Sequence, residues 1–172
     1  LFVYASRETH TWLEKALAAF TGEALSRASK LTGGGRNIDD YQVHAERMAQ
    51  LATELRAVQD FLAYAETIAK EGKPDALIDR MAIAFAGETA VKTFASAIAA
   101  SEDYGLDEAG IAKTIGDSAI LGLARRAMHE SAYREIGRQV ASRGGQNNLW
   151  LGDEMLTATR DSVRVFARNE VA

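Results

Sequence analysis

The sequence predicts an all-α fold, a helical bundle of about five to six mostly antiparallel helices. Pro74 is the single proline in 172 residues, and Ala, Leu, Glu, Arg and Lys fill long stretches, as is typical of helices. The sequence shows neither a sustained alternation of polar and apolar residues nor an Asn-Gly or Asp-Gly turn, so strands are not expected. The length suits one domain with a single sizeable core.

The first two predicted helices follow from apolar residues that recur every three or four positions. The first is expected over residues 9–31, with Thr11 and Glu14 spaced as a capping box, and the glycines at 33–35 end it. Its buried face is expected to contain Leu13, Leu17, Phe20, Ala24, Ala28 and Leu31. The second is expected over residues 39–72, with a heptad seam made of Tyr41, His44, Met48, Leu51, Leu55, Val58, Leu62, Ala65 and Ala69.

The remaining predicted helices lie after Pro74, which is tolerated in a first helical turn. A third helix is expected over 75–103, burying Leu77, Met81, Phe85, Val91, Phe94 and Ile98, and Gly105 is expected to cap it. A short helix is expected over 107–115, and a long one from 116 through Val140. The polar loop at 144–148 is the expected boundary, and an amphipathic helix then runs from Asp153 with Leu156, Val163, Phe166 and Val171.

The bulk properties exclude several functions. A net charge of −4 gives no basic field for nucleic acid. No apolar run approaches the roughly 18 residues that span a bilayer. The absence of cysteine fits a reducing compartment, so we expect a cytoplasmic protein. The chain begins with Leu1 and stops at Ala172 within a helical pattern, so we expect a piece of a longer protein.

Histidines are the first candidates for metal or acid–base chemistry, and the chain has three: His10, His44 and His129. The sequence contains no Glu-x-x-His and no His-Glu-x-x-His pattern, which helical metal sites use. His44 falls in a helix seam and is expected to be a hydrogen-bonded structural residue. His10 and His129 are expected to be exposed helix residues.

Other candidates have a simpler structural interpretation. Gly33–Gly35 with Arg36 could cradle a phosphate, but no Walker pattern follows, and a flexible loop is expected. Glu88 could be a buried carboxylate with a perturbed pKa, or lie at the edge of its helix face beside a basic partner. The arginines at 125, 126, 134, 138 and 143 are expected to form a solvated face, and the aromatic residues Phe61, Tyr64, Phe85, Phe94 and Tyr133 are expected in the core. No catalytic, cofactor-binding or metal residue is predicted.

The last helix resembles the first helix of the acyl-CoA dehydrogenase family. The resemblance lies in LTATRDSVRVFARNEVA, residues 156–172, with the pattern Arg160-Asp161-x-Val163-Arg164-x-Phe166-Ala167. Upstream, the second helix is similar to an amino-terminal helical extension of methylsuccinyl-CoA dehydrogenases, flavoenzymes of the ethylmalonyl-CoA pathway. This similarity is clearest at Gln42, Met48-Ala49, Leu51-Ala52-Thr53, Ala57-Val58 and Ala63-Tyr64-Ala65. It implies an extension over 1–150 and a truncated first dehydrogenase helix over 151–172.

The resemblance implies an FAD-dependent α,β-oxidation of a short branched acyl-CoA, in which a glutamate takes the α-proton and flavin N5 accepts the β-hydride. The flavin-binding β domain and the carboxy-terminal helical domain with the base are expected beyond Ala172. The chain itself is then a non-catalytic part that packs against the rest of the dehydrogenase or a twin subunit, in an expected homodimer. Two alternatives remain open: a stand-alone helical protein-interaction module, and a metal- or cofactor-holding bundle.

Overall fold

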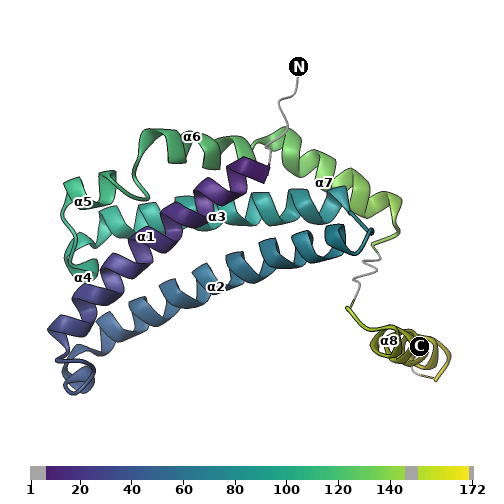
Figure 1. The fold of residues 1–172 in the computed structure, drawn as a ribbon, viewed down its shortest axis with the longest axis horizontal. Coiled ribbons are helices and arrows are strands. Elements are labelled where there is room, and N and C mark those ends of the chain that lie inside the picture. Colours follow the sequence, from purple (N-terminus) through teal and green to yellow (C-terminus); the bar gives the residue numbers. More distant parts are fainter. Residues whose placement is uncertain (1–6, 146–150, 171–172) are drawn as a thin grey trace. The chain divides into compact units, whose positions relative to one another are not determined.

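The all-α prediction is confirmed by the computed structural model, which describes residues 7–145 and 151–170. Every regular element in these ranges is a helix (Figure 1). The elements are α1 (Arg7–Leu31), the 3-10 helix η1 (Ile38–Tyr41), α2 (Gln42–Lys70), α3 (Ala76–Ala99), α4 (Ser101–Tyr104), α5 (Glu108–Ala112), α6 (Ser118–Ala127), α7 (Glu130–Ser142) and α8 (Glu154–Glu170). None of these helices is long and apolar enough to cross a membrane.

The chain divides into two compact units, Leu1–Arg138 and Gln139–Ala172. The first contains α1 to α6 and most of α7, and the second contains α8. Part of the expected boundary loop, residues 146–148, lies outside the described residues. The division proposed from the resemblance, after residue 150, stays a prediction.

The core of the first unit lies where α3 packs against α1, α2 and α6 (Figure 1). The predicted face of α1 is largely confirmed, since Leu13, Leu17, Phe20 and Ala24 are fully buried. Leu31, at the end of this face, is exposed. The capping-box prediction is wrong, because Thr11 lies inside a helix that already includes Arg7. Two polar residues with capping-box spacing do not mark the start of a helix when the residues before them also adopt helical conformation.

The heptad seam predicted for α2 is confirmed at its centre. Buried positions on this helix are Met48, Leu51, Val58, Leu62, Ala65 and Ile68. The first turn differs from the prediction, since residues 38–41 form a 3-10 helix and the α-helix begins at Gln42. Asp75 then begins α3, where its side chain accepts a hydrogen bond from the Leu77 amide at 2.9 Å.

The predicted buried face of α3 is partly wrong. Leu77 is buried as expected, but Ile98 is 51% exposed, and the other predicted side chains are half-buried. The buried surface consists mainly of small residues: Ala82, Ala84, Ala86, Gly87, Thr89, Ala90, Thr93 and Ala97. Because α3 has neighbours on several sides, small side chains fill the closest contacts and large ones lie at the edges.

The predicted long helix from 116 to 140 is interrupted. The Asp117 side chain caps its start by accepting from the amides of Ala119 at 2.8 Å and Ile120 at 3.2 Å. The helix ends at Ala127, and α7 begins at Glu130. The ring Nδ1 of His129 accepts from the Ser131 amide at 3.3 Å, and the His129 carbonyl accepts from the Ala132 amide at 2.8 Å. His129 thus accepts hydrogen bonds from the first turn of α7 and lies just before that helix. The sequence has no glycine or proline at this break.

The closest helix contact in the first unit yields a stability prediction. A Cβ on Gly87 would lie 2.9 Å from the Ala127 Cβ and 3.1 Å from the Ala124 carbonyl oxygen. We expect Gly87→Ala to lower the free energy of unfolding by about 1–3 kcal/mol, because α3 and α6 must separate. Gly22→Ala, whose Cβ meets nothing within 4 Å, is the control. It should raise stability by up to about 1 kcal/mol. Urea unfolding followed by circular dichroism measures both, and equal effects would contradict the packing argument.

Candidate functional site

The three histidines lie in separate places. His10, in α1, is half-buried rather than exposed as predicted, and it borders a crevice of about 70 Å³ with Leu62 and Ile83. His44 is half-buried in α2 with its ring edge-on to Tyr41, at 6.3 Å between centroids. His129 is exposed as predicted, but it lies at the break before α7. Within the described part of the chain, no three or more His, Asp or Glu side chains come together in a way that could hold a metal ion.

The glycine triplet forms an interhelical loop, as expected, with positive φ at Gly33, Gly34 and Gly35. The Arg36 Nε donates a hydrogen bond to the Gly33 carbonyl at 3.0 Å. The Gly35 amide donates to the Thr32 hydroxyl at 3.1 Å. The Arg36 guanidinium and the Gly35 amide, which a phosphate site would use as donors, therefore already donate to groups within the loop.

Glu88 lies at the edge of its helix face and is exposed, so the buried-carboxylate interpretation is wrong. The Tyr133 hydroxyl donates to its Oε1 at 2.6 Å. Burial, and then this hydrogen bond to the carboxylate, raise the pKa of Tyr133 to about 12. Tyr133 itself was predicted in the core, yet it is 38% exposed, whereas Phe61, Phe85 and Phe94 pack against the core as expected.

An ion pair also joins α3 to α7, and two more lie within α7. The Arg80 Nη1 lies 2.9 Å from Glu135 Oε1, and Arg138 Nη2 lies 2.8 Å from Glu135 Oε2. Arg134 pairs with Glu130 on the same helix. Two arginines of the predicted stripe, Arg134 and Arg138, thus have acidic partners on an exposed face, which agrees with the solvated interpretation.

Two open hollows lie on the surface of the first unit. One, of about 950 Å³, lies beside the end of α1, the start of α2 and α4, and Tyr41, His44 and Tyr104 line it. The other, of about 900 Å³, lies between α1 and α6. We call it the α1–α6 groove and define it by Trp12, Lys15, Lys113, Asp117, Ile120 and Arg126. Sequence reasoning missed it because its two sides are about a hundred residues apart; only Trp12, off the apolar face of its helix, hints at it.

The described residues do not fit a flavin. Their buried polar side chains are Thr21, Thr32, Thr89 and Thr93, without a buried charged group. A flavin ring that exchanges hydride needs a largely enclosed cavity that excludes water. The two hollows are open and would leave part of any bound ligand in solvent.

The second unit presents an amphipathic helix whose apolar residues are uncovered. Asp153 caps α8 by accepting from the Met155 amide at 2.6 Å, so the predicted start is confirmed. Met155, Leu156, Val163 and Phe166 form one side, with exposed fractions between 54% and 76%. We call these four the apolar face of α8. Val171, also predicted for it, lies outside the described residues.

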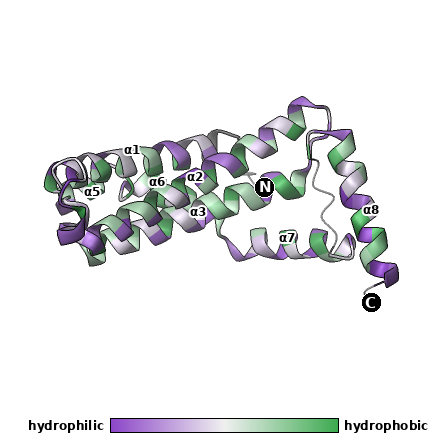
Figure 2. Ribbon diagram, turned by 90° about the horizontal axis from the view of Figure 1, so that it is seen from below, coloured by the Kyte–Doolittle hydropathy of each residue, from purple (hydrophilic) through white to green (hydrophobic). Residues whose placement is uncertain are grey.

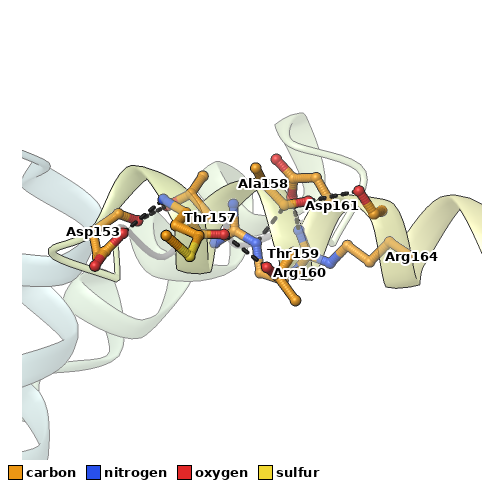
Figure 3. Close-up of polar contacts among 9 residues, drawn as sticks. Asp153, Thr157, Ala158, Thr159, Arg160, Asp161 and Arg164 are labelled. Carbon is orange, nitrogen blue, oxygen red and sulfur yellow. Dashed lines mark hydrogen bonds and ion pairs between the residues drawn. The ribbon is translucent and has the colours of Figure 1, made fainter.

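The other side of α8 is charged. Asp161 lies 2.9 Å from Arg160 and 3.8 Å from Arg164 (Figure 3). The hydrogen bond from Arg160 is the main cause that lowers the pKa of Asp161. In Figure 2 the ribbon of α8 alternates between hydrophilic and hydrophobic residues. A helix with this pattern is suited to cover its apolar side with another protein surface.

Comparison with known proteins gives one match. The family model described as acyl-CoA dehydrogenase, C-terminal domain, matches residues 13–134, more than half of the chain. No curated protein and no solved structure matches. The match runs from α1 into α7 and leaves α8 outside. The carboxy-terminal helical domain of the family was expected beyond Ala172, whereas this match lies within residues 13–134.

The contact between Tyr133 and Glu88 predicts a change at high pH. The pKa of Tyr133 in the folded protein, about 12, lies above its ordinary value of 10.0. The protonated Tyr133 therefore contributes fully to the stability of the folded protein below pH 10.0, and this contribution is lost as pH rises through about 12. Tyr133→Phe should remove this loss of stability, and the phenolate absorbance titration should lose its highest step. Glu88→Gln should shift that step to lower pH. An unchanged titration in Tyr133→Phe would show that another group carries the step.

Proposed function

Because the chain belongs to the acyl-CoA dehydrogenase family, we propose that it is a non-catalytic helical part of an FAD-dependent acyl-CoA dehydrogenase, with a role in packing or subunit assembly. The enzyme as a whole would oxidise an acyl-CoA at its α,β-bond, with the flavin as hydride acceptor. The chain's own part would be structural.

The apolar face of α8 is the observation that carries this proposal. Burying each of its four side chains would contribute roughly 1.5–3 kcal/mol. The charged side, with Asp161 held by two arginines, would remain in solvent. A helix of this kind gains stability when another surface covers one side, which suits the rest of the dehydrogenase chain or a second subunit.

The absence of buried charge supports the non-catalytic part of the proposal. Abstraction of an α-proton needs a base within hydrogen-bond reach of the substrate, in a site that excludes water. Among the described residues the buried polar groups are threonine hydroxyls, which are too weakly basic for this step. The base and the flavin would therefore belong to another part of the enzyme.

We further propose the domain order. Residues 1–150 would be an amino-terminal extension, and residues 151–172 would begin the dehydrogenase's own amino-terminal domain. The pattern Arg160-Asp161-x-Val163-Arg164-x-Phe166-Ala167 in α8 supports the second part. The similarity of residues 13–134 to a C-terminal domain suggests that the extension is a helical domain of that type, placed ahead of the catalytic part. A stop codon directly after Ala172 would instead favour the stand-alone interaction module.

The substrate proposed from the upstream resemblance is methylsuccinyl-CoA, in a cytoplasmic homodimer. The full-length gene product should purify with a yellow flavin and oxidise methylsuccinyl-CoA, while residues 1–172 alone should oxidise no acyl-CoA. Activity on other acyl-CoA thioesters but not on methylsuccinyl-CoA would remove the substrate assignment and keep the family role. A pure full-length protein without flavin would contradict both the substrate assignment and the proposed role in an FAD-dependent dehydrogenase.

Two valines of α8 provide a matched test of its apolar face. Val163 and Val165 are 60% and 56% exposed and lie about 200° apart around the helix. In the full-length enzyme we expect Val163→Glu to weaken assembly and lower thermal stability, because it places a charge in the covered surface. Val165→Glu should change both only slightly. Sedimentation velocity and thermal unfolding measure the two effects. Equal behaviour of both variants would contradict the proposed packing surface.

A further inference from the structure

The α1–α6 groove combines an exposed aromatic ring with basic side chains. We propose that this groove binds a nucleotide, a ligand that joins a flat aromatic base to phosphate groups. This inference is independent of the packing role of α8, because every residue of the groove lies in the first unit. Its volume of about 900 Å³ falls in the range of small-molecule sites, about 300–1,000 Å³.

Trp12 supplies the surface on which a base would stack. Its side chain is 58% exposed, although its neighbour Leu13 is fully buried in the core. The Lys15 ammonium lies 5.8 Å from the centre of the indole ring, one helical turn along α1. Nucleic-acid bases stack on exposed aromatic rings of this kind, and a nearby cation strengthens the contact.

Three cations supply the surface for phosphate. Lys15 lies on the α1 side, and Lys113 and Arg126 lie on the opposite side. The Arg126 guanidinium folds back along α6 over Gly122, which has no side chain there. Its Nη1 lies 3.6 Å from where a Cβ on Gly122 would be, and both residues line the groove. None of the three cations forms an ion pair within the described part of the chain.

The groove contains one acidic residue among its described lining, and that residue is already engaged. The Asp117 carboxylate accepts hydrogen bonds from two backbone amides at the start of α6. Its charge is thereby partly offset by the helix dipole. Three cations beside one capped carboxylate form a local positive surface on a chain whose net charge is −4. The apolar floor, formed by Ala16, Ile120 and Leu123, suits the flat face of a base.

Fluorescence of Trp12 provides a direct test with the 172-residue chain. Trp12 and Trp150 are the two tryptophans, so Trp150→Phe makes Trp12 the sole reporter. We expect ADP to change the emission saturably, and to bind at least about tenfold more tightly than adenosine or pyrophosphate, because each of these lacks one half of the ligand. Calorimetry on the unmodified chain measures the same affinities independently. Absence of saturable ADP binding overturns the proposal, and equal binding of pyrophosphate and ADP overturns the role of the indole.

Matched variants distinguish binding of ADP in the groove from attraction of ADP by the net charge of the chain. The double variant Lys113→Gln/Arg126→Gln should weaken ADP binding by about tenfold or more. Arg56→Gln/Lys70→Gln makes the same change in net charge on exposed positions of α2 and should leave binding within about twofold. Trp12→Ala, measured by calorimetry, should weaken binding by about fivefold or more. Unchanged melting temperatures would show that each variant is folded. An equal loss in both double variants overturns the proposed site.

Discussion

The close approach of α3 to α6 is the contact on which the first unit depends. At Gly87 the two helices come so near that even a methyl group would meet Ala127 and the carbonyl of Ala124. This nearness requires small residues on both helices. Helix α3 also contacts α1 and α2. The large core side chains, Leu13, Leu17 and Phe20, come mainly from α1 and cover the surface that α3 presents.

The outer helix α7 is held in a different way. Its described side chains include none that is fully buried. Polar contacts join it to α3 instead, through the hydrogen bond of Tyr133 to Glu88 and the ion pair of Arg80 with Glu135. Partly exposed contacts of this type contribute less than apolar burial. The first unit therefore combines a tightly packed centre with a helix attached by polar groups, which can open at lower cost in free energy.

These features show what the segment that matches the dehydrogenase family buries in its interior. The buried interior contains alanine, larger aliphatic residues and threonine, without charged groups. Such an interior is suited to hold helices together. Among the described residues, the apolar face of α8 offers a surface for a large partner, and the α1–α6 groove has the size and charge for a small anionic one.

The sequence by itself determined the all-α class, the glycine-rich turn after α1, the seam of α2, and the starts of helices near Asp75, Asp117 and Asp153. Each of these follows from residues close together along the chain, where helical periodicity and capping act. Only the tertiary structure decided which side of α3 is buried, that the chain turns at His129, and that Trp12 and Arg126 line the same groove. These features depend on contacts between residues far apart in sequence, whose distances are set by how closely the helices pack.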